Sequence, residues 1–123
     1  MSAPVCGRGD IWMLDGCPGR GSEPGGFRPA VIVQCDEGNH APGARTTILV
    51  PLTSQGRAYS FYVPVPAGAM TGLKVDSWAN CTRVFTVAKD RLRTRLGVAP
   101  SAALEAIARA LADTLGLPPD MAL

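Results

Sequence analysis

The sequence predicts a single domain of mainly β structure with a C-terminal α-helix. Short apolar runs rich in Val, Ile, Tyr and Phe recur between clusters of Gly, Pro, Asn and Asp, as expected for strands joined by turns. From Ser101 onward Ala and Leu dominate, with apolar residues at helical spacing. A chain of 123 residues can bury one modest core. Five or more short strands followed by a helix favour a small, strongly bent β-barrel covered by the helix.

The N-terminal elements are bounded by glycines. Residues 10–15 form an apolar run between Gly9 and Gly16, which predicts the first strand. Residues 16–27 hold five glycines and two prolines, a composition and length typical of a functional or disordered loop. The apolar, β-branched residues that follow predict a second strand at 28–35.

Turn residues separate the central strands. Asp-Glu-Gly-Asn and Pro-Gly predict a turn or loop at 36–45, and the apolar run after it predicts a strand at 46–52. Pro51 indicates that this strand is irregular or lies at an edge near its end. Further strands are predicted at 59–63 and at 74–82, with 84–87 extending or following the latter.

The C-terminal segment has the pattern of an amphipathic helix. Pro100 suits a first helical position and Gly116 a C-terminal cap. The apolar stripe favours core or dimer packing over a cofactor site, and a shorter helix is predicted at 90–96. The residues at helical spacing are Leu104, Ile107, Ala108, Leu111 and Leu115.

The cysteine and histidine content predicts no metal site and no cofactor. The four cysteines, Cys6, Cys17, Cys35 and Cys81, form no Cys-x-x-Cys pair, and His40 is the single histidine. We expect reduced thiols, some of them in the core, in a cytoplasmic protein. The sequence has no signal-peptide pattern and no apolar run of 18 residues, so neither secretion nor a membrane span is expected.

The charge balance restricts how nucleic acid could bind. The formal net charge is only +2, and charged residues make up 18% of the chain. Binding of a polyanion would therefore depend on where a few basic side chains lie, because the total charge is small.

Residues 21–29, Gly-Ser-Glu-Pro-Gly-Gly-Phe-Arg-Pro, have the composition of an anion-binding loop at a strand junction. Gly25 and Gly26 would let backbone N–H groups approach a ligand closely. Arg28 supplies a planar, always charged fork of donors that suits phosphate or carboxylate oxygens.

Four motifs in order make the interpretation specific. They are Arg-Gly-Asp-x-Trp at 8–12, Gly-Ser-Glu-x-x-Gly-x-Arg-Pro at 21–29, Val-Ile-Val-Gln at 31–34 and Pro-Leu-Thr-Ser at 51–54. This order resembles the MazF/PemK toxin family, ribonucleases of toxin–antitoxin modules, over residues 8–117. The resemblance implies an SH3-like β-barrel of the PemK/CcdB type, usually a homodimer. The whole chain, 1–123, would be one domain, with 1–7 a loose N-terminal arm.

The resemblance implies that Arg28, Thr53 and Glu23 are catalytic. One histidine rules out a two-histidine mechanism, and no clustered carboxylates indicate a two-metal site. Metal-free attack by the ribose 2′-OH remains, giving a 2′,3′-cyclic phosphate and a 5′-OH. Arg28 would stabilise the phosphate and Thr53 would hydrogen-bond to it, whereas Glu23 either orients Arg28 or accepts the 2′-OH proton. Without the resemblance, a structural arginine, a turn hydroxyl and a solvated carboxylate explain these residues.

Other residues near these motifs are expected to bind single-stranded RNA. Glycine N–H groups, hydroxyls, amides and arginines would contact the backbone, and aromatic rings would stack on bases. Tyr59 is a further stacking candidate, whereas Trp12 and Tyr62 are expected in the core. The expected RNA-binding residues are Ser22, Gly25, Gly26, Phe27, Ser54, Gln55, Arg57, Trp78 and Arg83.

Two departures from the family pattern bear on target choice. Pro24 stands where the family commonly has glutamine, and Arg83-Val84-Phe85 replaces a typical Gln-x-Arg. The family's RNA target sequence is therefore not transferred to this chain.

Three functional readings follow from the residues. The first is a sequence-specific endoribonuclease (an mRNA interferase) that inhibits translation and growth and is controlled by a MazE-like antitoxin, whose disordered tail folds over the RNA groove. The alternative is a CcdB-like gyrase poison, in which Arg28 and Thr53 would be dispensable. An SH3-like module for polyproline segments fits least, because seven aromatic residues are spread along the chain.

Overall fold

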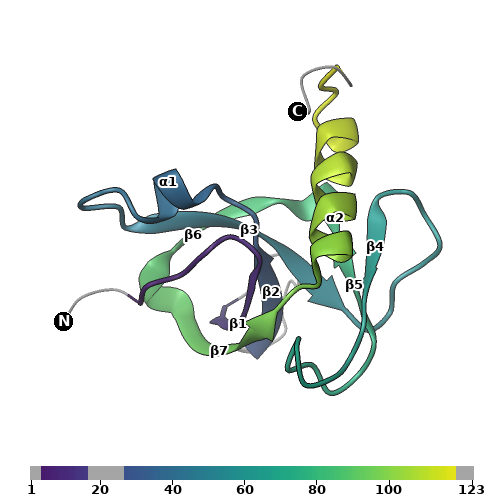
Figure 1. Ribbon diagram of the computed structural model, residues 1–123, viewed down its shortest axis with the longest axis horizontal. Coiled ribbons are helices and arrows are strands. Elements are labelled where there is room, and N and C mark those ends of the chain that lie inside the picture. Colours follow the sequence, from purple (N-terminus) through teal and green to yellow (C-terminus); the bar gives the residue numbers. More distant parts are fainter. Residues whose placement is uncertain (1–3, 17–26, 119–123) are drawn as a thin grey trace.

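A computed structural model describes residues 4–16 and 27–118. Within these ranges the chain forms one antiparallel sheet and a C-terminal helix, which confirms the predicted fold class (Figure 1). The elements are β1 (Asp10–Asp15), β2 (Phe27–Ile32), α1 (Asp36–Asn39), β3 (Thr46–Thr53), β4 (Tyr62–Val65), β5 (Ser77–Asn80), η1 (Cys81–Arg83), β6 (Phe85–Ala88), η2 (Lys89–Arg91), β7 (Leu92–Val98) and α2 (Ser101–Thr114).

The sheet bends around β3, its central strand. The strand order is β4-β5-β3-β2-β1-β7, and β6 also pairs with β3. Along one edge of β3, the first half pairs with β6 and the end pairs with β5, while β2 occupies the other edge. The turn η1 connects β5 to β6 at this bend and contacts both β3 and α2. Strands that share one edge of β3 in succession give the sheet its barrel-like curvature.

Each face of the sheet buries its own apolar cluster. Because side chains alternate between faces along a strand, neighbours in sequence enter different clusters. Ile11, Val31 and Val50 pack with Ile107 of α2 on one face. On the other face, Trp12, Leu14, Ala30, Ile32 and Leu49 pack with Val87 and Leu92. The prediction that Trp12 lies in the core is confirmed.

The predicted C-terminal helix is confirmed, with its expected cap. Pro100 precedes the first helical residue, one position earlier than predicted. Gly116 has φ +69°, a conformation that favours glycine, and the Leu117 N–H donates to the Ala112 carbonyl at 2.8 Å. Ile107 is fully buried, whereas Leu115 is 60% exposed, so the apolar stripe reaches the core only along its first three turns.

The helix predicted at 90–96 is wrong. Those residues form the short turn η2 and most of strand β7, which pairs with β1. The sequence Arg-Leu-Arg-Thr-Arg at 91–95 alternates polar and apolar residues at its start, and buried Leu92 lies between exposed Arg91 and Arg93. A buried residue between two exposed ones fits the start of a strand with one solvated face, and pairing with β1 decides the conformation.

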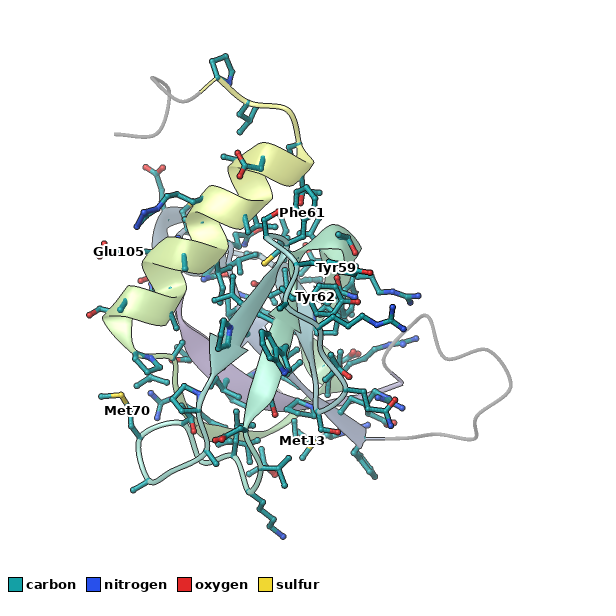
Figure 2. All side chains as sticks on the ribbon, turned by 90° about the vertical axis from the view of Figure 1, so that its right-hand side faces the viewer. Met13, Tyr59, Phe61, Tyr62, Met70 and Glu105 are labelled. Atoms are coloured by element: carbon teal, nitrogen blue, oxygen red, sulfur yellow. The ribbon has the colours of Figure 1, made fainter. Side chains whose placement is uncertain are left out.

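Other boundaries are shorter than predicted. The turn expected at 36–45 begins with the four-residue helix α1, and the strand expected at 59–63 begins only at Tyr62. Tyr62 is half-buried, and its ring lies 5.9 Å from that of Tyr59 in an edge-to-face contact (Figure 2). The strand expected at 74–82 is confined to β5, with η1 after it and β6 as a separate strand.

The Arg-Gly-Asp-x-Trp motif fixes the start of the sheet. Asp10 Oδ2 accepts hydrogen bonds from the Gly7 N–H at 2.9 Å and from Trp12 Nε1 at 3.2 Å. Its Oδ1 lies 3.3 Å from Nε of Arg95 on β7. The Arg8 N–H donates to Asp36 at 2.7 Å, and this bond, followed by one from the Asn39 amide, lowers the pKa of the Asp36 carboxyl. These contacts give the motif a structural role.

Two buried thiols meet the expectation of core cysteines. Cys6 and Cys81 are buried, whereas Cys35 is exposed. Burial raises the pKa of the Cys81 thiol to about 11. In the part of the chain that is described, no helix is long and apolar enough to cross a membrane.

We expect Cys81 to make the fold less stable in alkali. A raised pKa in the folded state means that the stabilising contribution is complete below the ordinary value of 9.0 and is lost as the pH rises to about 11. The free energy of unfolding should therefore fall by roughly 2 kcal/mol more over this range in the native protein than in a Cys81→Ala variant. Urea unfolding of both proteins at several pH values measures this difference. If the free energy of unfolding changed equally with pH in both proteins, Cys81 would not be the cause of the loss of stability.

Candidate functional site

The strand register places Arg28 of β2 and Thr53 of β3 opposite each other. Strands β2 and β3 pair antiparallel through Ala30↔Pro51, Val31↔Val50 and Ile32↔Leu49. Continued by two residues, this register places Arg28 opposite Thr53. Residues opposite each other in an antiparallel pair project to the same face, with Cβ atoms about 5 Å apart. The hydrogen-bonded ladder ends before them because Pro29, the next residue of β2, has no N–H to donate.

Trp78 continues the same row on the next strand. The pairing of β3 with β5 sets Thr53 opposite Trp78, and that of β1 with β2 sets Leu14 opposite Arg28. Leu14 is fully buried, whereas Arg28, Thr53 and Trp78 are half-buried. The row Leu14, Arg28, Thr53, Trp78 therefore begins in the apolar cluster that contains Trp12 and Leu14. It continues to a solvent-accessible surface that carries a cation, a hydroxyl and an indole.

The Thr53 hydroxyl is oriented by the turn that follows it. The Gln55 N–H donates to Thr53 Oγ1 at 3.1 Å. The hydroxyl hydrogen has no acceptor among the described residues, so it remains available for donation. Thr53 is thus set up to donate a hydrogen bond to an incoming anion.

The remaining predicted residues lie around this row or outside the described residues. Ser54, Gln55 and Arg57 are exposed on the loop after Thr53. Phe27 is 60% exposed, but it neighbours Arg28 along β2 and so projects to the opposite face. Arg83 is exposed in η1, at the bend between β5 and β6, and is not part of the row. The residues outside the described ranges are Ser22, Glu23, Gly25 and Gly26.

An open hollow at the end of β1 involves residues that the motifs did not indicate. It has a volume of about 550 Å³ and is lined by Asp15, Gly16, Asp90, Arg91 and Arg93. Arg93 Nη2 lies 2.8 Å from Asp15 Oδ2, and Asp15 pairs with Phe27 across β1 and β2. Arg91, Arg93 and Arg95 alternate in the sequence, which could have indicated a strand with one basic face. The prediction of a helix at 90–96 led us to overlook this pattern.

The donor set of the described residues contains no group of three or more His, Cys, Asp or Glu side chains placed to hold a metal ion. The chemistry that this part of the chain offers is that of a guanidinium, a hydroxyl and an aromatic ring. Such groups bind and polarise a phosphate rather than coordinate a cation.

Comparison with known proteins identifies the family of this chain. Residues 7–115 match the model of the PemK-like, MazF-like toxins of type II toxin–antitoxin systems. The chain is 37% identical to Endoribonuclease MazF9 of Mycobacterium tuberculosis (strain ATCC 25618 / H37Rv), over 85% of this chain and 91% of that protein.

Solved structures share the fold over almost the entire chain. An endoribonuclease from a mycobacterial species has a TM-score of 0.75 and 25% identity, covering 96% of this chain and 98% of its own. A mycobacterial endoribonuclease solved in complex with its cognate antitoxin has a TM-score of 0.72 and 27% identity, covering 92% and 97%. The chain is thus a homologue of MazF endoribonucleases, and it belongs to the PemK-like, MazF-like toxin family of type II toxin–antitoxin systems.

Proposed function

We propose that this toxin is a sequence-specific endoribonuclease that cleaves single-stranded RNA without a metal ion. The observation that carries the proposal is the row in which the Arg28 guanidinium and the Thr53 hydroxyl lie level on neighbouring strands. Family membership and the endoribonuclease relatives support it independently. Cleavage of messenger RNA would stop translation and growth, as the toxin of such a module requires.

The chemistry follows from these two side chains. The ribose 2′-oxygen forms a bond to the adjacent phosphorus, the bond from phosphorus to the 5′-oxygen breaks, and a 2′,3′-cyclic phosphate and a 5′-OH result. One proton leaves the 2′-OH and one reaches the 5′-oxygen. Negative charge grows on the non-bridging oxygens, where Arg28 and Thr53 would donate charge-assisted hydrogen bonds. Glu23, in the proposal, orients Arg28 or takes the 2′-OH proton.

The exposed groups next to the row would hold the flanking nucleotides. Ser54, Gln55 and Arg57 are at the surface beside Thr53, where they can reach the RNA backbone. Trp78 would present part of its ring to a base, and Phe27 and Arg83 would contact nucleotides farther from the cleaved bond.

We propose two protein partners as well. One is a second copy of the chain, as a homodimer. The other is a cognate antitoxin of the MazE type, because a related endoribonuclease has been solved in complex with its cognate antitoxin. Light scattering of the purified protein, alone and mixed with a MazE-type antitoxin, tests both.

Replacing Thr53 by valine should lower the cleavage rate constant by about 10²- to 10³-fold, the usual cost of losing one donor to a developing oxyanion. Valine keeps the shape of the side chain and removes the hydroxyl. Single-turnover cleavage of an RNA oligonucleotide measures the change. A matched control, Thr86→Val, removes an exposed hydroxyl on β6, outside the row, and should leave the rate close to the native value. Equal rates for Thr53→Val and the native protein would exclude the hydroxyl from the reaction.

A substrate variant tests the proposed nucleophile. An RNA oligonucleotide is cleaved, its cut position is mapped, and a 2′-deoxy nucleotide is placed on the 5′ side of that bond. Cleavage at that bond should disappear, because the attacking oxygen is missing. The same substitution one nucleotide away serves as the control. Cleavage that continues at the deoxy position would require another nucleophile and would refute the mechanism.

A further inference from the structure

The backbone of Gly56 lies directly on the indole of Trp78. A Cβ atom built at residue 56 would overlap Cβ, Cγ and Cδ1 of Trp78. The overlap involves Cβ and the ring atoms nearest to it, which are the least mobile part of this side chain. Only glycine fits here without moving either the loop or the ring.

This contact is linked to the Thr53 hydroxyl from two sides. Trp78 is the residue of β5 that pairs with Thr53 on β3. Gln55, whose N–H donates to Thr53 Oγ1, is the immediate neighbour of Gly56. The loop therefore closes a small ring of contacts: Thr53 to Gln55, Gln55 to Gly56, Gly56 to Trp78, and Trp78 back to Thr53. A shift at Gly56 has to be passed to the Gln55 N–H that fixes the hydroxyl.

We infer that Gly56 and Trp78 are positioning residues for Thr53, in addition to any contact that Trp78 makes with RNA. This inference rests on the proposed function, since it assigns the two residues to the same reaction. The loop packs on the indole, and this contact fixes the position of the Gln55 N–H. The Gln55 N–H in turn holds the Thr53 hydroxyl with its hydrogen directed to the substrate phosphate. The function assigned to this half-buried tryptophan is thus to keep one hydroxyl in a single orientation.

The first test is Gly56→Ala. We expect the rate constant at saturating RNA to fall about 10- to 100-fold, because a misdirected hydroxyl forms a weaker hydrogen bond to the phosphate oxygen in the transition state. KM should change less than the rate constant, since the charged groups that bind RNA are untouched. The thermal unfolding midpoint should change little, because Gly56 lies in a loop outside both apolar clusters.

The same substitution in a Trp78→Gly protein separates positioning from general damage. Removing the ring and its Cβ removes the three atoms that would lie nearest to the new methyl group. Gly56→Ala should then cause no further loss relative to Trp78→Gly alone. An equal loss in both backgrounds would overturn the inference, because Gly56 would then be acting through another contact.

Amide hydrogen exchange at Gln55 gives a readout that does not need activity. The Gln55 N–H should be protected in the native protein and should exchange faster in Gly56→Ala, as it should in Thr53→Val, where the acceptor is absent. Unchanged exchange and unchanged rate in Gly56→Ala would overturn the inference. If the native protein cleaved no RNA, the proposed function would fail, while the exchange rates would still decide whether Gly56 holds the hydroxyl.

Discussion

Replacing Arg28 by alanine is expected to lower the rate constant of RNA cleavage by at least about 10³-fold while the protein stays folded. The guanidinium is the one cation placed by the register opposite Thr53 among the described residues, so its loss removes the positive charge that would stabilise the developing charge on the phosphate. Arg28 is half-buried near the start of β2 and belongs to neither apolar cluster. Single-turnover kinetics and circular dichroism of the variant measure the two effects.

A matched arginine on another surface provides the control. Arg109 lies on the exposed side of α2, and Arg109→Ala removes the same charge from the molecule. It should cleave RNA at close to the native rate. Arg28→Lys should recover only part of the lost activity, because an ammonium keeps the charge and loses the planar fork of donors. Native activity in Arg28→Ala would remove this residue from the mechanism.

Replacing Ile107 by aspartate is expected to unfold the protein. Ile107 is fully buried where α2 meets the sheet, in the cluster that contains Ile11 and Val50. An unpaired carboxylate at this position costs several kcal/mol, on top of the lost apolar burial. Domains of this size are stable by only about 5–15 kcal/mol, so most of that margin would be lost. Circular dichroism and urea unfolding report the result.

The same side chain placed on the outer face of α2 is the control. Glu105 points away from the sheet (Figure 2), and Glu105→Asp puts an aspartate there without burying it. This variant should lose less than about 1 kcal/mol, the difference in helix propensity between the two residues. A folded Ile107→Asp protein with near-native stability would mean that α2 does not pack as described.

The sequence predicted the elements whose pattern is decided locally. The helix α2 has its apolar period, a proline before it and Gly116 after it, and all three are present in the structure. β1 lies within the predicted residues because glycines bound its apolar run. The pairing of segments that are distant in the sequence could not be predicted in this way. Most of the segment at 90–96 forms β7 because it pairs with β1, and local residue propensities do not indicate which strand will pair with it.

The candidate site was predictable in its residue types but not in its geometry. Arg28 and Thr53 were identified from motifs, and the register of β2 and β3 brings these residues, 25 positions apart in the sequence, opposite each other. Gly56 could not be identified in this way, because the sequence around a glycine in a turn does not show whether an aromatic ring packs against its backbone. The role that we infer for it depends on the close approach of the loop to Trp78 in three dimensions.

The ends of the cleavage products test metal-free attack by the ribose 2′-OH most directly. The purified protein is incubated with an RNA of mixed sequence in the presence of EDTA, with Arg28→Ala as the inactive comparison. We expect fragments with 2′,3′-cyclic phosphate and 5′-OH ends, cut at a recurring sequence, and none from the variant. Fragments with 5′-phosphate ends, or no cleavage of any RNA together with perturbed DNA supercoiling by gyrase, would contradict the account.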